Sequence, residues 1–160
     1  MSNRHYACYQ TPVGPLKMGY EGDTLVALKR VEIESDDGQK TPLTEQINQE
    51  FSEYFEGKRQ RFTFKYRLSG TPFQMKVWQT LLEIPYGETC TYKDIAQKIG
   101  NAKAARAVGA ANHNNPIMIV VPCHRVIGSQ GKLVGYDGGL DMKAALLLLE
   151  QRNVQETPSA

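Results

Sequence analysis

The 160-residue chain has few cysteines, no long apolar run and little net charge. Its three cysteines, Cys8, Cys90 and Cys123, form no Cys-x-x-Cys pair, which is typical of a reduced, intracellular protein. Residues 1–4 lead into no apolar signal core and no segment approaches the length of a membrane span, so we expect a cytoplasmic protein without a membrane partner. The formal charge of +2 is too small to indicate nucleic-acid binding by itself, so any basic surface must be local.

Signals for metals and nucleotide cofactors are also missing. His5 and Cys8 have the spacing of metal ligands, but no second pair follows them. Cys123 and His124 are adjacent and belong to no spaced set of ligands. The chain contains neither a phosphate-binding GxxxxGK[ST] loop nor a GxGxxG motif followed by an acidic residue. We therefore expect no metal and no cofactor.

Residues 1–69 are predicted to form a small α+β unit. Extended segments at residues 6–10, 16–20 and 24–29 are separated by turns rich in proline and glycine, which suggests a meander. Apolar residues between Ile47 and Phe55 then fall at helical spacing, and Gly57 is placed to end that helix. Residues 62–68 alternate between apolar and polar types, the pattern of a half-buried strand.

Residues 70–154 are predicted to form a second, mainly helical unit, followed by a frayed tail at residues 155–160. Thr71, Pro72 and Gln74 have the pattern of a capping box at a helix start. Two short helices follow, the first ending at Gly100 and the second spanning residues 103–111. Helix, tight turn, helix is the helix-turn-helix outline, although many such pairs bind nothing.

The second helix of this pair consists largely of alanine and glycine, and Arg106 is its one long cation beyond Lys103 at its start. Small side chains allow close packing against a neighbouring element. They would equally allow a thin helix to approach a narrow groove. Composition alone favours the packing interpretation.

Residues 119–126 are the most informative stretch of the chain. An uncharged, β-branched run precedes Pro122 and Cys123, so we expect it to be buried and extended. A thiol with the ordinary pKa of about 8.5 is mostly protonated near neutrality and needs a nearby base or positive charge to become reactive. His124 and Arg125 are both at hand. Cys123 is therefore predicted to be a nucleophile.

Glu150 follows four leucines in the last predicted helix, residues 141–151. A carboxylate at this position is either the solvated end of a helix or a buried group that needs a partner. His124 would suit as that partner, but the residues alone favour the solvated end of a helix.

Five motifs, in order and at consistent spacing, resemble those of the O6-alkylguanine-DNA alkyltransferases, the self-inactivating DNA repair methyltransferases. The motifs are Thr71-Pro72-Phe73-Gln74 with Val77-Trp78, Ile84-Pro85-Tyr86-Gly87 with Thr91-Tyr92, Ala105-Arg106-Ala107-Val108-Gly109 with Asn115-Pro116, Pro122-Cys123-His124-Arg125-Val126, and Gly135-Tyr136 with Gly138-Gly139. The resemblance covers about residues 70–152. It implies an α+β protein with an N-terminal ribonuclease-H-like lobe and a helical, winged-helix-type DNA-binding lobe that carries the active site.

The resemblance implies a suicidal methylated-DNA–protein-cysteine S-methyltransferase that repairs O6-alkylguanine, with O4-alkylthymine as a second candidate substrate. Cys123 would take the alkyl group as a permanent thioether, so each molecule turns over once. His124 would act as base toward the thiol through a water, and Glu150 would orient that histidine, as in hydrolase triads. Tyr92 would donate a proton or hydrogen bond to the leaving guanine, and Asn115 would hold the turn that presents the thiol.

The same resemblance implies that a monomer binds the minor groove of double-stranded DNA containing alkylated bases. The damaged base must be flipped out of the duplex, and Arg106 would fill the gap that it leaves. Ala105 and Gly109 belong to the same DNA-binding motif. Tyr136 and the backbone around Val126 would line the base pocket, and Lys143 would add positive charge.

One position departs from the family pattern. His113 stands where family members often carry an arginine or lysine, which suggests some pH sensitivity of phosphate binding. Two other functions stay open beside alkyl transfer. A DNA-binding regulator or damage sensor would bind independently of Cys123, and a Cys–His–Glu hydrolase would turn over many times.

Overall fold

The computed structural model describes residues 3–32 and 38–156, and the chain divides into two compact units, Met1–Leu68 and Ser69–Ala160. Both units contain helices and strands, so the predicted α+β class is confirmed. The tail predicted from residue 155 begins too early, because the last helix continues to Glu156. Residues 157–160 lie outside the described part of the chain.

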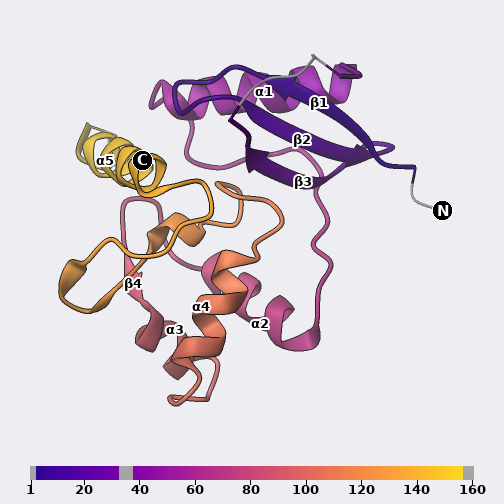
Figure 1. Ribbon diagram of the computed structural model, residues 1–160. Coiled ribbons are helices and arrows are strands. Elements are labelled where there is room, and N and C mark those ends of the chain that lie inside the picture. Colours follow the sequence, from indigo (N-terminus) through magenta and orange to yellow (C-terminus); the bar gives the residue numbers. More distant parts are fainter. Residues whose placement is uncertain (1–2, 33–37, 157–160) are drawn as a thin grey trace. The chain divides into compact units, whose positions relative to one another are not determined.

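The first unit contains an antiparallel sheet in the order β1-β2-β3, formed by His5–Tyr9, Leu16–Glu21 and Thr24–Arg30 (Figure 1). This is the predicted meander, with strand ends that differ from the expected ones by a residue. The first turn is closed by hydrogen bonds in both directions between the backbones of Thr11 and Gly14. Gly14 has a φ of 107°, a conformation that disfavours any side chain at this position.

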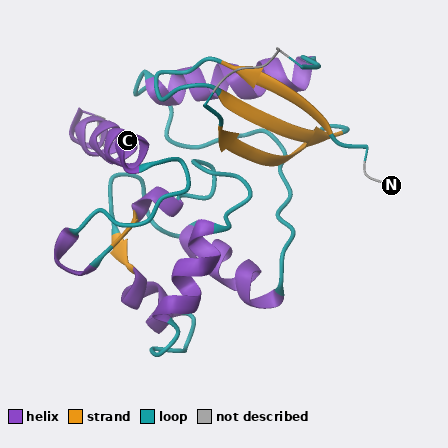
Figure 2. Ribbon diagram, viewed as in Figure 1, coloured by secondary structure: helices purple, strands orange, loops and turns teal. Residues whose placement is uncertain are grey.

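Helix α1, Pro42–Phe55, lies along one face of this sheet (Figure 2). It begins at a capping box on Thr41, and it ends at Gly57, whose positive φ allows the hydrogen bonds of a Schellman motif. Its buried face includes Ile47, Phe51 and Tyr54. The hydroxyl groups of Tyr9 on β1 and Thr44 on α1 are 3.0 Å apart, which joins the helix to the sheet.

The strand predicted over residues 62–68 is wrong. Only one isolated bridge forms there, between Leu25 and Tyr66, through two backbone hydrogen bonds of 3.0 Å made by Leu25. The alternation instead points aromatic rings inward: Phe62 and Phe64 pack on Phe51, with ring centroids 4.9 and 5.9 Å apart. A period of two therefore reflects burial of every second side chain here without a continuous ladder of hydrogen bonds.

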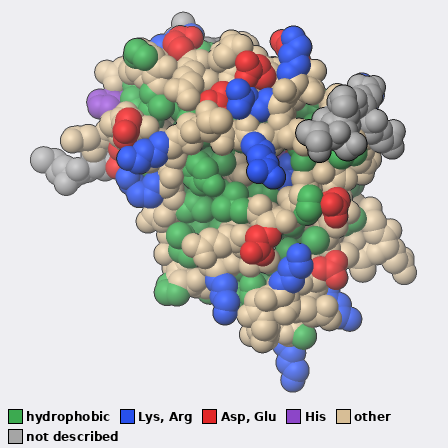
Figure 3. Space-filling view, turned by 180° about the vertical axis from the view of Figure 1, so that it is seen from behind, with side chains coloured by type: hydrophobic (Ala, Val, Ile, Leu, Met, Phe, Trp, Pro, Cys, Tyr) green, Lys and Arg blue, Asp and Glu red, His purple; other side chains and the backbone are tan. Residues whose placement is uncertain are grey.

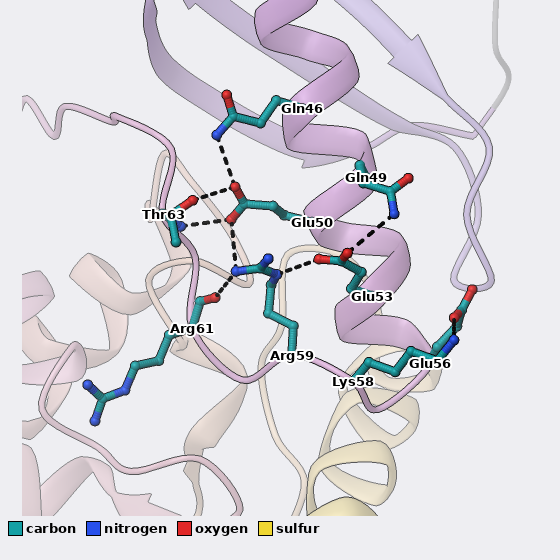
Figure 4. A network of polar contacts seen from close by, with 9 residues as sticks. All are labelled: Gln46, Gln49, Glu50, Glu53, Glu56, Lys58, Arg59, Arg61 and Thr63. Carbon is teal, nitrogen blue, oxygen red and sulfur yellow. Dashed lines mark hydrogen bonds and ion pairs between the residues drawn. The ribbon is translucent and has the colours of Figure 1, made fainter.

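A polar network attaches the segment after α1 to the helix itself (Figure 4). The buried carboxylate of Glu50 accepts hydrogen bonds from the backbone and hydroxyl of Thr63, at 2.7 and 2.6 Å. Arg59 lies 3.5 Å from Glu50 and 2.8 Å from Glu53. Three other cations of the first unit also form ion pairs, and these are Lys58–Glu56, Lys65–Asp23 and Arg67–Glu21. These cations therefore serve the unit's own carboxylates.

The second unit begins with α2, Pro72–Leu81, which starts at the predicted capping box of Thr71 and Gln74. Helices α3, Tyr92–Lys98, and α4, Ala105–His113, pack against each other and against α2. Trp78 is buried and donates from Nε1 to the carbonyl oxygen of Ala111 (2.8 Å), which fixes α2 on α4. The helix-turn-helix outline predicted from the sequence is thus present, with the second helix starting two residues later than expected.

The rest of the second unit carries the reactive segment. Strands β4, Cys90–Thr91, and β5, Val126–Ile127, pair in parallel, so that Cys90 faces Val126. The short 3-10 helix η1, Cys123–Arg125, directly precedes β5, and a second one, η2, covers Ser129–Gly131. Helix α5, Leu140–Glu156, follows the loop and packs on η1. Residues of η1 and α5 therefore meet inside one unit.

Candidate active site

The chain reaches Cys123 through a tight turn and not through the extended segment predicted for it. Residues 119–121 are buried as expected, but Ile119 has a φ of 73°, and Val121 donates to the carbonyl of Ile117 (3.0 Å). A positive φ is strained for a β-branched residue, and its surroundings must impose it. β-Branching favours a strand in general, so the sequence could not reveal this turn.

Asn115 holds the turn from both sides. Its Nδ2 donates to the carbonyl oxygen of Val121 (2.8 Å), and its Oδ1 accepts from the backbone of Ile117 (3.0 Å). Asn112 on α4 donates to the carbonyl oxygen of Cys123 itself (3.4 Å). Two asparagines therefore fix the backbone immediately before and at the cysteine.

The Cys123 side chain is buried, with 3% of the residue exposed. Burial raises the pKa of the thiol to about 11, although a hydrogen bond with Asn115 and the charge of Lys143 act in the opposite direction. Burial also lowers the pKa of Lys143. At neutral pH the thiol is protonated, so a base must remove its proton before or during reaction.

His124 and Glu150, which are 26 residues apart, meet in the interior. Nε2 of His124 lies 2.7 Å from Oε2 of Glu150, and both residues are at most 1% exposed. Burial alone would raise the pKa of Glu150, but His124 and Arg125 outweigh that effect and hold it below the ordinary value. The ionised carboxylate only accepts, so Nε2 carries a proton and Nδ1 is the basic nitrogen.

The remaining nitrogen of His124 is available as a base. Nδ1 is buried and has no hydrogen-bond partner among the residues that the structure describes. Burial lowers the pKa of His124, against the opposing effect of Glu150, so the ring is neutral at pH 7. A neutral imidazole next in sequence to a protonated thiol is the resting state of a nucleophile–base pair.

Arg125 completes the cluster. Its Nε and Nη2 donate to the two carboxylate oxygens of Glu150, at 2.7 and 3.0 Å, and its Nη1 donates to the carbonyl oxygen of Ile84 (2.8 Å). The guanidinium also lies 5.6 Å from the centre of the Tyr86 ring. Its position next to Cys123 had suggested a charge for the thiol, whereas its hydrogen bonds are made to the carboxylate.

The loop between β5 and α5 carries Tyr136, and its backbone binds two more of the predicted site residues, Tyr92 of α3 and Lys143 of α5. Tyr92 and the fully buried Lys143 both donate to the carbonyl oxygen of Val134, at 3.2 and 2.8 Å. Tyr136 is buried, and Gly138 is close enough that a Cβ there would lie 3.0 Å from its ring. Val126, in β5, is also fully buried.

The predicted DNA-contact residues lie on α4. Arg106 is exposed and makes no hydrogen bond or ion pair within residues 3–32 and 38–156. Gly109, one turn later, lies against the ring of Tyr92, and a Cβ added there would be 3.9 Å from that ring. Ala105 is half-buried at the start of the helix. His113, at its end, is 3.7 Å from Asp137 of the loop.

Charge elsewhere is mixed. On the described part of the face drawn in Figure 3, basic and acidic side chains are interspersed. No helix within the described residues is long and apolar enough to cross a membrane. The same residues contain no group of three or more His, Cys, Asp or Glu side chains that could hold a metal ion.

Two family models match the chain. The 6-O-methylguanine DNA methyltransferase DNA-binding domain matches residues 72–152, and the ribonuclease-like domain of the same methyltransferase matches residues 4–68. The methylated-DNA–protein-cysteine methyltransferase of Methanosarcina barkeri is 46% identical over an alignment of 157 residues, and the match covers 94% of this chain and 99% of that protein. That of Mycobacterium tuberculosis is 46% identical over 156 residues, covering 92% of each.

Solved structures agree with the sequence relatives. The crystal structure of Mycobacterium tuberculosis O6-methylguanine methyltransferase matches with a TM-score of 0.87 at 42% identity, over 98% of this chain and 96% of that one. The Mycobacterium tuberculosis OGT in complex with DNA matches with a TM-score of 0.86 at 44% identity, over 92% and 93%.

Fold and site together define a two-unit α+β protein whose helical unit buries a cysteine beside a histidine–glutamate pair. The family matches extend over both units. The chain belongs to the 6-O-methylguanine DNA methyltransferase family, which confirms the family and the ribonuclease-like and DNA-binding domains expected from the sequence.

Proposed function

We propose that this protein repairs DNA by transferring the alkyl group of O6-alkylguanine irreversibly to its own Cys123, once per molecule. The observation that carries the proposal is the buried Cys123 next to the His124–Glu150 pair, in a chain whose relatives are methylated-DNA–protein-cysteine methyltransferases. O4-alkylthymine has the same alkyl–oxygen bond and is the second substrate to test. Three cysteines without a Cys-x-x-Cys pair agree with a location in the cytoplasm.

The reaction begins with the thiol proton. Nδ1 of His124 takes it, directly or through one water, while Glu150 stabilises the imidazolium that forms. The sulfur then forms a bond to the alkyl carbon, the bond from that carbon to O6 breaks, and guanine keeps the electron pair. Guanine finally takes up a proton, so the thiol proton is replaced by the alkyl group and no cofactor is consumed.

Four other side chains support this step. Tyr92 would donate to the departing guanine, for which it must leave the carbonyl of Val134. Lys143 would stabilise the thiolate, since its charge acts on Cys123. Tyr136 and the backbone at Val126 would line the pocket of the flipped base. Asn115 would keep the sulfur in line with the alkyl carbon by holding the turn before it.

Helix α4 would bind the DNA. Its small residues, including Ala105 and Gly109, leave room for a close approach to the minor groove, and the exposed Arg106 is available to fill the space of the flipped base. Filling that space offsets part of the unstacking cost, which is a few kcal/mol. Double-stranded DNA with an alkylated base is therefore the expected partner.

Intact mass spectrometry with a duplex carrying one O6-methylguanine tests the proposal. We expect a gain of one methylene unit on Cys123, complete at one equivalent of DNA and absent in Cys123→Ser. Cys90→Ser is the matched control, because Cys90 is half-buried outside the cluster and its loss should leave the modification intact. An unchanged mass with retained DNA binding would indicate a sensor, and repeated turnover would indicate a hydrolase.

A further inference from the structure

Glu150 has two basic partners of different kinds. His124 is neutral in the resting state, so its hydrogen bond alone leaves a buried carboxylate without a counter-charge. Arg125 is always protonated, and it donates to both oxygens of the same carboxylate. The arginine is therefore the permanent counter-charge, and the histidine becomes charged only when it takes a proton.

The environment makes this counter-charge necessary. Glu150 is 1% exposed, and burial by itself favours the protonated acid. A protonated Glu150 would no longer stabilise an imidazolium, because its negative charge would be lost. The other titratable groups that face the cluster are Tyr86, whose pKa burial raises, and Lys143 of α5, whose pKa burial lowers. Neither donates a hydrogen bond to the carboxylate as Arg125 does.

Arg125 is itself fixed at its far side. Nη1 donates to the carbonyl oxygen of Ile84, and the guanidinium lies over the ring of Tyr86. Three hydrogen bonds in a planar fork leave the guanidinium a single orientation. The Glu150 carboxylate that Arg125 binds is consequently held in one orientation as well, with Oε2 directed at Nε2 of His124.

We infer that Arg125 is a positioning residue for alkyl transfer: it keeps Glu150 ionised and oriented, so that His124 presents Nδ1 to the thiol. This inference rests on the proposed function of Cys123 and His124. Arg125 touches neither the thiol nor the substrate in this scheme and acts through Glu150 alone. Its loss should therefore alter the pH dependence of the chemical step.

The test is the pH profile of the single-turnover rate with saturating duplex that contains O6-methylguanine. Loss of a positive charge at this distance raises the pKa of both Glu150 and His124, and shifts of about one unit or more are typical. In Arg125→Met the acid limb of the profile should move to higher pH by about one unit, which is a tenfold slower rate on that limb. Arg125→Lys should move it less, because the charge stays while the fork is lost.

Arg152→Met is the matched control, since Arg152 is an exposed arginine of α5 only two residues from Glu150. Its profile should coincide with that of the wild type. The amplitude of the single turnover counts the folded sites in each preparation, so misfolding lowers the amplitude without moving the limb. If Arg125→Met does not fold, Arg125→Lys carries the test.

Unshifted acid limbs in the arginine variants, with a reactive wild type, would overturn the role of Arg125 and leave the proposed function intact. A wild type that gains no alkyl group would overturn the proposed function instead. The two failures are thus separate observations.

Discussion

At the scale of single residues, the site combines a thiol that burial makes less acidic with a histidine that burial makes less basic. Both shifts oppose proton transfer in the resting protein. A buried thiol that stays protonated is protected from adventitious oxidants and alkylating agents, since the thiolate is the reactive form. Its reactivity must then be gained when the substrate enters, through the charges of His124, Glu150 and Lys143.

Asn115 is the residue whose loss should separate positioning from acid–base chemistry. In Asn115→Ala the turn loses two hydrogen bonds, and the carbonyl of Val121 and the amide of Ile117 lose a partner. We expect a loss of stability of about 1–3 kcal/mol. The single-turnover rate should fall about tenfold to a hundredfold, because the sulfur is no longer fixed relative to the alkyl carbon.

Stopped single-turnover assays and urea unfolding of the same preparations measure both effects. Asn114→Ala is the control: the neighbouring asparagine is exposed, and its side chain donates to the carbonyl oxygen of Ala110 at the end of α4. An Asn115→Ala protein as reactive as Asn114→Ala would show that the turn does not position the thiol.

Residue-level prediction from the sequence succeeded in part. The pairing of Glu150 with His124 was one of two interpretations, and the structure has the two in contact. The role of Arg125 was not predicted, because a cation beside a cysteine suggests activation of the thiol. Which neighbour a long, flexible side chain selects depends on the fold, and here the carboxylate arrives from 25 residues away.

At the scale of elements, helix ends were predictable because capping is local chemistry. The capping box of Thr71 and Gln74 and the stop at Gly100 need only three or four adjacent residues. The strand at residues 62–68 and the extended segment at 119–121 were wrong for the opposite reason. Alternation and β-branching favour a strand, but a ladder needs a partner strand elsewhere in the chain, and none pairs along these residues.

The two glycines of the helix pair should respond oppositely to the same substitution. Gly109 lies inside α4, and an added Cβ meets Tyr92 only at 3.9 Å, an ordinary contact. Gly109→Ala should therefore raise the free energy of unfolding by about 0.5–1 kcal/mol, the usual helix preference of alanine. Gly100 follows α3 with a φ of 84°, and an added Cβ meets nothing. Gly100→Ala should cost about 1 kcal/mol through the backbone alone.

Fluorescence of Trp78, the single tryptophan, follows the unfolding of this unit. Both variants should be unfolded in urea under identical conditions. A destabilised Gly109→Ala would mean that the gap between α4 and Tyr92 cannot accept a methyl group, which would bear on how closely the helix packs there.

At the scale of the whole molecule, the cations of the two units differ in how they are paired. Several cations of the first unit are paired with that unit's own carboxylates, as in the Glu50 network of Figure 4. Those of the helix-turn-helix include Arg106, which makes no ion pair with a residue that the structure describes. A net charge of +2 thus does not reveal where individual cations lie. Composition could not place Arg106 on the helix predicted to bind DNA, whereas the order of the motifs could.

Stability should depend on pH at both ends of the neutral range. The folded-state pKa values of His124 and Glu150 are lowered, so the stability that they contribute is present at neutral pH and is lost on acidification. For His124 the loss begins as the pH falls below about 6.5, the ordinary pKa of histidine in the unfolded chain. The stability contributed by Glu150 is lost at lower pH, as the pH falls below about 4.3, the ordinary pKa of glutamate in the unfolded chain.

On the alkaline side, Cys123 should account for most of the difference in pH-dependent stability between the wild type and Cys123→Ala. Its folded-state pKa is raised to about 11, so the folded protein keeps a proton that the unfolded chain releases above about pH 8.5. The stability that Cys123 contributes is therefore fully present below that pH and declines as the pH rises toward the folded pKa, by up to about 1.4 kcal/mol per pH unit.

Cys123→Ala removes this contribution, so its free energy of unfolding should change less steeply with pH between pH 8.5 and 10. Urea unfolding followed by Trp78 fluorescence at four pH values in this range measures both slopes. Tyr86, on which Cys123 exerts no charge effect, titrates in both proteins and cancels in the comparison. Parallel slopes would mean that the thiol is ionised or solvated in the folded state, which would contradict the buried, protonated resting form from which the proposed transfer starts.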